Sequence, residues 1–276
     1  MMDLIESFLL GVLQGITEFL PVSSSGHLVL AQELLNRNLD QGITFEIVVH
    51  FGSLFSIAIF FRERIYEIIK TVWTYLLQPS GYIKNWKEQY NVRFVFYVIL
   101  SMIPAGLVGF LLKDYIEAAF SNPVLVSAML LVTGAILWTT KYQTESNKLV
   151  NPARAFIMGI AQSFAIIPGI SRAGTTITTG VWLGMKKTEV ADFSFLMLLP
   201  VLVGAMILEL KDMFEMGFAH QPVADLTVAF FASFLSGLIA LKYLIKLFKG
   251  RSLHYFSFYC WAVGLLGLFY FGFILS

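Results

Sequence analysis

Charged side chains and cysteine are both scarce in this chain. Only 13% of the 276 residues are charged, and the mean hydropathy is +0.75, whereas a soluble domain carries about 25% charged residues. This balance excludes a soluble globular enzyme and indicates a polytopic membrane protein. The single cysteine, Cys260, excludes a disulfide framework and a cysteine-based metal site.

Several signatures of other function classes are also missing from the sequence. It contains no glycine-rich nucleotide loop, no HExxH pair of metal-binding histidines and no nucleic-acid motif, so we expect no nucleic-acid partner. Asp3 and Glu6 precede the first apolar run, and no basic region does, so we expect no cleavable signal peptide.

Apolar runs of about 20 residues, the length that crosses a bilayer as a helix, recur along the chain. Two further apolar segments, 8–35 and 156–184, are interrupted by proline, glycine and hydroxyl residues. Irregular backbone at membrane depth is tolerated only where it is buried in protein or lines a cavity. We therefore predict a single all-α membrane domain (1–276) in which these two segments are re-entrant helical hairpins. Its six full spans are predicted at 43–61, 93–112, 122–140, 190–209, 226–246 and 255–274.

The two interrupted segments resemble each other, and each is followed by three spans. This divides the chain into repeat one (1–140) and repeat two (152–276). A re-entrant hairpin enters and leaves the membrane on the same side, whereas three spans carry the chain to the opposite side. We therefore expect the second copy to be inverted relative to the first. In inverted-repeat proteins the interrupted segments meet at a site near the membrane midplane. The matching residues are all 148 positions apart: Phe8/Phe156, Gly11/Gly159, Gln14/Gln162, Ser23/Ser171 and Gly26/Gly174.

Basic residues are distributed unevenly over this topology. If the N-terminus lies outside, only Arg37, Lys113 and Lys211 fall in outer segments, and Arg172 falls inside the second hairpin. The positive-inside rule then predicts that both termini and the opening of the site face outward. The cytoplasmic segment 62–92 either lies along the membrane surface or is a disordered connector. The fifteen inner basic residues are Arg62, Arg64, Lys70, Lys84, Lys87, Arg93, Lys141, Lys148, Arg154, Lys186, Lys187, Lys242, Lys246, Lys249 and Arg251.

Arg172 is the most informative single residue, because a charge in a membrane-embedded turn is costly and marks a functional candidate. If a half-helix begins near Ser171, its free N–H groups and positive dipole end would bind phosphate, and the arginine would add a bidentate fork. The alternative is that Arg172 pairs with a buried carboxylate only to hold the hairpins together. The residues expected to contribute to phosphate binding are Ser23, Ser25, Ser171, Arg172, Gly174, Thr175 and Thr176.

Glu18 and His27 are the acid–base candidates of the first hairpin, and Ser24 lies between them. A carboxylate or neutral imidazole beside a hydroxyl is what proton transfer or nucleophile activation requires. His27 could instead be a satisfied interfacial residue. Gln14 lies four residues before Glu18 on the same helix face and could orient it, bind water of an ion, or simply form a hydrogen bond.

Other acidic residues are weaker candidates. Glu46, four residues before His50, either faces the site as a second carboxylate or lies at the interface; the sequence leaves this open. Glu189 and Asp192 fall toward the cytoplasmic end of repeat two and are expected to be structural.

At these residues the chain resembles the undecaprenyl-pyrophosphate phosphatase family, also called the bacitracin-resistance protein family. The resemblance covers essentially the whole chain. It is carried by two long motifs in the right order, with Glu46 and Phe193-Ser-Phe fitting as well. The motifs are Gln14-Gly-Ile-Thr-Glu-Phe-Leu-Pro-Val-Ser-Ser-Ser-Gly-His27 and Pro168-Gly-Ile-Ser-Arg-Ala-Gly-Thr-Thr-Ile177.

The resemblance implies a hydrolase of the bacterial inner membrane that removes the terminal phosphate of a C55 isoprenyl pyrophosphate and so recycles the carrier lipid for cell-wall synthesis. It also implies bacitracin resistance and dependence on a divalent cation, Mg or Ca, with Glu18 as a ligand. The family often has a second glutamate where this chain has Gln14, and a serine where it has Ala173. The residues matching the family's functional positions are Glu18, Ser24, His27, Ser171, Arg172 and Thr176.

The nucleophile is left open among Ser24, His27 and water. A competing interpretation is a transporter that flips a lipid phosphate, because inverted repeats with broken helices are typical of transporters. A non-catalytic scaffold would have no use for buried Glu18 and Arg172. A lipid substrate and the bilayer are the expected partners, and a homodimer is left open.

Overall fold

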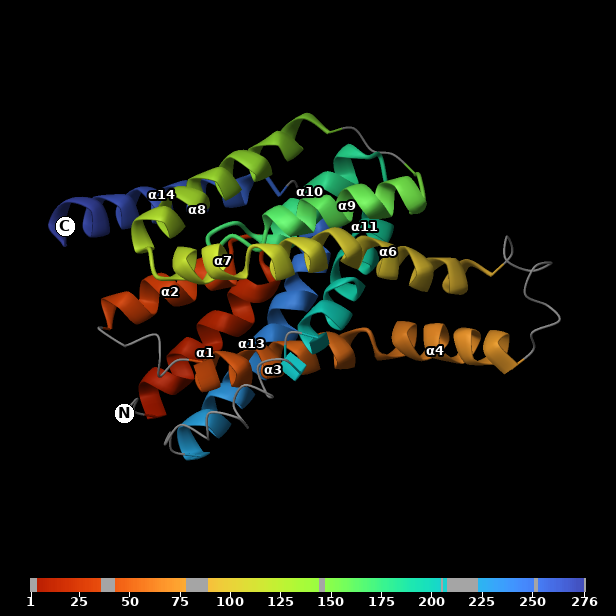
Figure 1. Ribbon diagram of the computed structural model, residues 1–276, viewed down its shortest axis with the longest axis horizontal. Coiled ribbons are helices and arrows are strands. Elements are labelled where there is room, and N and C mark those ends of the chain that lie inside the picture. Colours follow the sequence, from red (N-terminus) through yellow and green to blue (C-terminus); the bar gives the residue numbers. More distant parts are fainter. Residues whose placement is uncertain are drawn as a thin grey trace.

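The computed structural model describes residues 4–35, 43–77, 89–143, 147–204, 206–207, 223–250 and 253–275. Within these ranges the chain is helical, apart from turns and one parallel bridge between Lys148 and Met185 (Figure 1). The all-α prediction is confirmed for this part of the chain. The helices are α1 (Leu4–Phe19), α2 (Ser24–Leu34), α3 (Ile43–Phe60), α4 (Arg62–Leu77), α6 (Tyr90–Leu111), α7 (Lys113–Phe120), α8 (Pro123–Trp138), η3 (Thr139–Tyr142), α9 (Pro152–Phe164), α10 (Arg172–Trp182), α11 (Lys187–Leu196), α13 (Val223–Gly250), α14 (Tyr255–Phe269) and η4 (Tyr270–Ile274).

Helices long and apolar enough to cross a membrane confirm that this is an integral membrane protein. The ranges above contain four of them, and a fifth if α3 and α4, bent by 74°, form one broken span. The prediction of 43–61 corresponds to α3. Each of the four long helices overlaps one of the predicted spans 93–112, 122–140, 226–246 and 255–274. The four helices are Tyr90–Leu111, Pro123–Tyr142, Val223–Phe248 and Tyr255–Ile274.

The segment predicted as a span at 190–209 is interrupted. Helix α11 ends at Leu196, Met197 forms a turn, and the chain is helical again over 198–204 and 206–207; residues 205, 208 and 209 lie outside the described residues. Pro200 explains the break, because it has no N–H for the carbonyl of Leu196 and its ring would clash with that group.

Both interrupted segments are pairs of helices around a turn, as predicted. The first pair is α1 and α2, the second is α9 and α10, and Pro21 and Pro168 lie in the two turns. Helices α2 and α10 begin and end 148 residues apart. Each is capped by a serine, Ser23 or Ser171, whose Oγ accepts a hydrogen bond from the N–H three residues on. The sequence repeat is therefore also a repeat of local structure.

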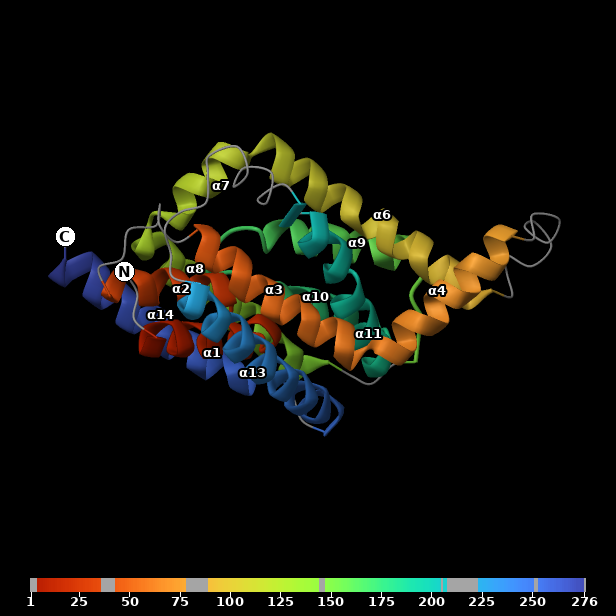
Figure 2. The ribbon, with the colours of Figure 1, turned by 90° about the horizontal axis from the view of Figure 1, so that it is seen from below.

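The two repeats exchange packing partners. Helix α1 of repeat one packs on α13 of repeat two, while α9 of repeat two packs on α6 of repeat one (Figures 1 and 2). Glycine permits both approaches. A Cβ at Gly11 would lie 2.5 Å from the carbonyl oxygen of Ala229, and one at Gly159 would lie 2.3 Å from that of Ser101. The first helix of each repeat is thus supported by a long helix of the other repeat.

We expect Gly11→Ala to destabilise the protein, because the methyl group would meet the backbone of α13 and not a mobile side chain. Overpacking of this kind costs about 1–3 kcal/mol. Gly106→Ala on α6 is the matched control, since its Cβ would have no atom within 4 Å. Thermal denaturation in detergent should give a lower midpoint for Gly11→Ala alone; equal midpoints would contradict the close packing of α1 on α13.

The segment 62–92 contains a regular helix, α4, over residues 62–77. Arg64 donates to Asn91 Oδ1 at 2.8 Å, and its guanidinium lies over the ring of Tyr90. These contacts hold α4 beside the start of α6 (Figure 1). The alternative of a disordered connector is therefore wrong for 62–77, while 78–88 lies outside the described residues. So do the basic residues Arg37, Lys84, Lys87, Lys211 and Arg251, and the side chain of Lys249.

Candidate active site

The turns of the two helix pairs touch each other. A Cβ at Gly26 would lie 3.0 Å from the Cα of Gly169, and one at Gly174 would lie 3.3 Å from the carbonyl oxygen of Pro21. Gly169 has φ +93°, a conformation that favours glycine. Gly26 and Gly174 correspond in the repeat, as do Pro21 and Gly169. The contact is therefore made twice, once by each repeat, and it brings the two turns into one site.

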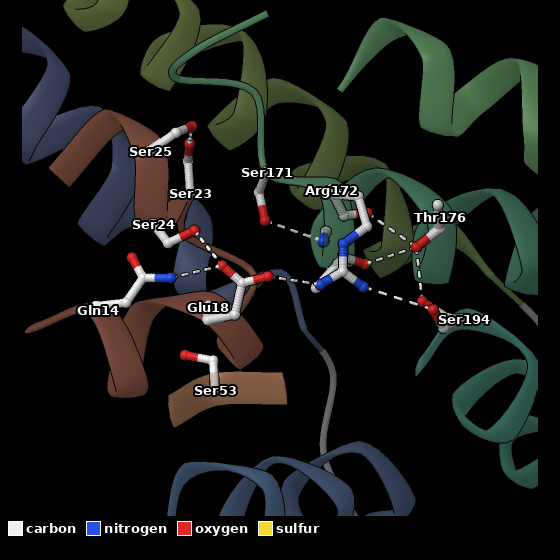
Figure 3. A network of polar contacts seen from close by, with 12 residues as sticks. Gln14, Glu18, Ser23, Ser24, Ser25, Ser53, Ser171, Arg172, Thr176 and Ser194 are labelled. Carbon is white, nitrogen blue, oxygen red and sulfur yellow. Dashed lines mark hydrogen bonds and ion pairs between the residues drawn. The ribbon is translucent and has the colours of Figure 1, made fainter. Parts of the chain in front are cut away.

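Glu18, at the end of α1, is at the centre of this site (Figure 3). It is only 8% exposed. Its Oε1 accepts from Arg172 Nη2 at 2.9 Å, and its Oε2 accepts from Ser24 Oγ at 2.6 Å and from Gln14 Nε2 at 3.1 Å. One buried carboxylate thus joins a cation, a hydroxyl and an amide from both helix pairs.

Arg172 is the first residue of α10, and its guanidinium extends across to the first helix pair (Figure 3). Besides Glu18, it donates from Nη1 to the carbonyl oxygen of Ser194 at 3.5 Å. Thr176 Oγ1 lies 2.6 Å from Ser194 Oγ and donates to the carbonyl oxygen of Arg172 at 2.8 Å. The buried ion pair considered as the alternative is therefore present. The role of Arg172 in phosphate binding stays a prediction.

The residues around Arg172 build a helix N-terminus, as the sequence predicted. Ser171 caps α10 by accepting from the N–H of Gly174 at 3.0 Å. The hydroxyl of Thr175 is buried and has no hydrogen-bond partner among the described residues. The positive end of α10 therefore faces the cluster that Glu18 holds together.

The three serines of the first turn do different things. Ser24 donates its hydroxyl to Glu18, which is the contact expected of a nucleophile and its base. Ser23 caps α2 with φ +72°, a strained conformation for a residue other than glycine. Its Oγ lies 3.3 Å from Ser25 Oγ, and both point away from Glu18 (Figure 3). The structure thus joins Ser24 to the Glu18–Arg172 cluster and does not join Ser23 or Ser25 to it.

His27 has partners other than Glu18 and Ser24. Its Nδ1 donates to the carbonyl oxygen of Ser23 at 2.7 Å, and its Nε2 lies 2.9 Å from the hydroxyl of Tyr259 on α14. A proton-carrying role next to Glu18 is therefore not supported by these contacts.

Glu46 lies apart from the cluster. Its Oε1 accepts from Gln32 Nε2 of α2 at 3.2 Å, and His50 Nδ1 donates to its backbone oxygen at 2.7 Å. Glu189 accepts from the hydroxyl of Tyr90 and from the N–H of Val150, which fits the structural role predicted for it.

Three residues of the site were not among the sequence candidates. Ser194 was signalled only by the Phe193-Ser-Phe motif. Thr133 of α8 donates to the carbonyl oxygen of Gly169 at 2.8 Å and accepts from the N–H of Ser171 at 3.0 Å. Tyr259 contacts His27. Thr133 and Tyr259 lie in apolar runs, where nothing in the sequence distinguishes them from packing residues.

Comparison with known proteins agrees with the motifs. The family described as Bacitracin resistance protein BacA matches residues 7–266. The chain belongs to this family. Relatives named undecaprenyl-diphosphatase match over nearly their full length. That of Desulforapulum autotrophicum is 39% identical over 274 residues (97% of this chain, 98% of the relative), and that of Christiangramia forsetii is 38% identical over 271 (97% and 98%). That of Methanobrevibacter smithii is 36% identical over 275 (96% and 96%).

The cation expected of a BacA family member can be tested against the donors present. Among the described residues no three His, Cys, Asp or Glu side chains gather as a protein-only metal site. Glu18 does offer a carboxylate, and Gln14 Oε1 is a buried oxygen without a hydrogen-bond partner there. Mg²⁺ is often held by one or two such groups together with substrate phosphates. The residues therefore fit a cation shared with a diphosphate.

Proposed function

We propose that this protein hydrolyses undecaprenyl diphosphate to undecaprenyl phosphate and inorganic phosphate in the membrane. The observation that carries the proposal is the chain of contacts from Ser24 through Glu18 to Arg172, which joins a hydroxyl, a carboxylate and a cation at the meeting point of the two turns. The names of the relatives supply the substrate. The reaction recycles the lipid carrier of peptidoglycan synthesis and accounts for the bacitracin resistance in the family's description.

Arg172 and the N-terminus of α10 bind the diphosphate and stabilise the charge that develops on it during transfer. Ser24 attacks the terminal phosphorus while Glu18, 2.6 Å from its hydroxyl, takes the proton. The anhydride bond breaks and undecaprenyl phosphate leaves. Water then cleaves the Ser24 phosphoester and releases phosphate. Direct attack by water with Glu18 as the base is the alternative course, and it needs the same two residues.

A divalent cation, Mg or Ca, is part of the proposal. Glu18 and Gln14 would hold it, and when bound it would neutralise charge on the diphosphate oxygens.

The proposed topology is an inverted repeat with both termini and the site opening on the outer side of the bacterial inner membrane. The exchanged packing of α1 with α13 and α9 with α6 supports it. Helix α1 begins and η4 ends at the same end of the molecule, and α4 lies at the opposite end (Figures 1 and 2). This arrangement also supports the proposed topology. In six crossings, α3 and the broken segment 187–207 would each make one.

The test is phosphate release by the purified protein in detergent from a C55 or shorter isoprenyl diphosphate, with Mg²⁺ and with chelator. Release that depends on the cation is expected. Folded protein that releases no phosphate would contradict the hydrolase and favour lipid-phosphate transport, which a liposome flipping assay would then measure.

We also expect Glu18→Gln to bind the product more tightly than the wild type does. Diphosphate or phosphate must compete with Glu18 for Arg172, because Nη2 of the guanidinium is already paired. Removing the carboxylate charge should raise affinity for a short isoprenyl monophosphate about tenfold, or ~1.4 kcal/mol. Calorimetric titration in detergent measures this, with Glu46→Gln as the control. Weaker binding by Glu18→Gln would mean that Glu18 orients Arg172 for the ligand and does not compete with it.

A further inference from the structure

Helices α8 and α14 lie outside the Glu18–Arg172 cluster and pack closely on each other. Trp261 Nε1 of α14 donates to the carbonyl oxygen of Leu131 on α8 at 3.2 Å. A Cβ at Gly264 would lie 2.8 Å from the carbonyl oxygen of Ser127. The two helices are therefore packed as one unit, and each extends a polar side chain to one of the two turns that form the site.

Helix α8 holds the turn of the second helix pair. Thr133 is 1% exposed, and its hydroxyl donates to the carbonyl oxygen of Gly169 and accepts from the N–H of Ser171. It thus pairs one acceptor and one donor of non-helical backbone, groups that must find a partner where they lie away from water. Ser171 caps α10, and Arg172 follows it directly. Thr133 consequently fixes the backbone from which the guanidinium extends.

Helix α14 holds the turn of the first helix pair. Because the carbonyl oxygen of Ser23 can only accept, Nδ1 of neutral His27 carries the proton and Nε2 accepts from the hydroxyl of Tyr259. Cys260 Sγ also approaches the carbonyl oxygen of Pro21, at 3.9 Å. Pro21 and Gly169 are equivalent positions of the two repeats, so each turn receives a side-chain donor at the same place.

We propose that Thr133 and Tyr259 are positioning residues of the site, each fixing the turn that belongs to the other repeat. Thr133 sets the place of Arg172. Tyr259 holds the His27 ring through Nε2, and the ring in turn holds the carbonyl of Ser23, next to the reacting Ser24. His27 is then a positioning residue too. This inference rests on the proposed hydrolysis for its kinetic consequences, and the bonds themselves can be tested without activity.

The first test compares Thr133→Val, which has the same shape without the hydroxyl, with Thr133→Ser, which restores it. Thr133→Val should lower kcat about tenfold to a hundredfold with a smaller change in KM, since small misplacements of catalytic groups cost that much. Thr133→Ser should stay within about threefold of the wild type. Thr140→Val is the control, because its hydroxyl donates to Leu137 of the same segment. Equal kcat values for the valine and serine variants would overturn the role of Thr133.

The second test uses ¹⁵N-histidine NMR of the wild type, Tyr259→Phe and, as a control on the same helix, Tyr255→Phe, whose side chain is exposed. In the wild type, His27 should be protonated at Nδ1 and accept at Nε2. In Tyr259→Phe, the Nε2 resonance should move to that of a nitrogen without a donor, and kcat should fall about tenfold. An unchanged Nε2 resonance, or a wild type protonated at Nε2, would overturn the role of Tyr259.

The kinetic and NMR measurements together distinguish a failure of this inference from a failure of the proposed function. A wild type that releases no phosphate would contradict the hydrolase, while the NMR comparison would still judge the bond between Tyr259 and His27. An active wild type whose kcat survives Thr133→Val and Tyr259→Phe would leave the hydrolase standing and overturn the positioning roles.

Discussion

Glu18→Gln is expected to reduce phosphate release from an isoprenyl diphosphate by about 10²–10⁴-fold, the usual contribution of a general base. The amide has nearly the same shape as the carboxylate but cannot take the proton of Ser24, whose hydroxyl lies 2.6 Å from Glu18 Oε2. The loss should appear in kcat, because binding through Arg172 remains. Initial rates over a range of substrate concentrations measure it.

Glu46→Gln is the matched control for this prediction. It removes a carboxylate that is hydrogen-bonded to Gln32, away from the Glu18–Arg172 cluster, and should keep nearly full activity. Loss of activity in Glu46→Gln with normal activity in Glu18→Gln would contradict the assignment of Glu18 as the general base and would place that base at the start of α3.

Arg172→Ala is expected to lower kcat/KM by about 10³-fold or more, as the loss of a cation that stabilises charge in phosphoryl transfer does. Arg172→Lys should recover only part of the activity, because a lysine keeps the charge but not the fork that reaches both Glu18 and the carbonyl of Ser194. Arg62→Ala on α4, which removes an exposed guanidinium, is the control.

Stability must be measured beside these rates. Arg172→Ala leaves the buried carboxylate of Glu18 without its cation, and breaking a buried ion pair costs about 3–5 kcal/mol. The double variant Glu18→Gln/Arg172→Gln carries neither charge and should denature at a higher temperature than Arg172→Ala while remaining inactive. An inactive double variant with wild-type stability would show that the pair serves the reaction and not the fold. Normal activity in folded Arg172→Ala would contradict the proposed mechanism.

The sequence predicted the parts of this protein that depend on local pattern. Hydrophobic length gave the long helices, and proline and glycine in apolar segments gave the two interrupted ones. The charge of Arg172 and the serines of the first turn led to the cluster because polar groups in a membrane are costly wherever they occur. A pairing of Arg172 with a buried carboxylate was considered, and the structure shows that this carboxylate is Glu18.

The rest depends on tertiary packing, which local pattern does not encode. The role of Thr133 could not be predicted, because a threonine in an apolar helix has the same appearance whether it bonds its own helix or another segment. His27 was expected near Glu18 from its nearness in sequence, yet the first turn of α2 directs it to Tyr259 of α14. The break in 190–209 could have been predicted from Pro200. A proline in an apolar run does not always break the helix, because Pro104 lies within the continuous helix α6.

The exchanged packing has a consequence for biosynthesis. Helix α1 is made first, yet its partner α13 begins at Val223 and the support of its turn, α14, begins at Tyr255. The small residues on α1, Gly11 and Gly15 among them, therefore lack their native neighbour α13 until the last two long helices have been inserted into the bilayer. Glu18 would meet Arg172 in native geometry only then. A chain that is interrupted before α13 would contain both charged residues and still lack a finished site.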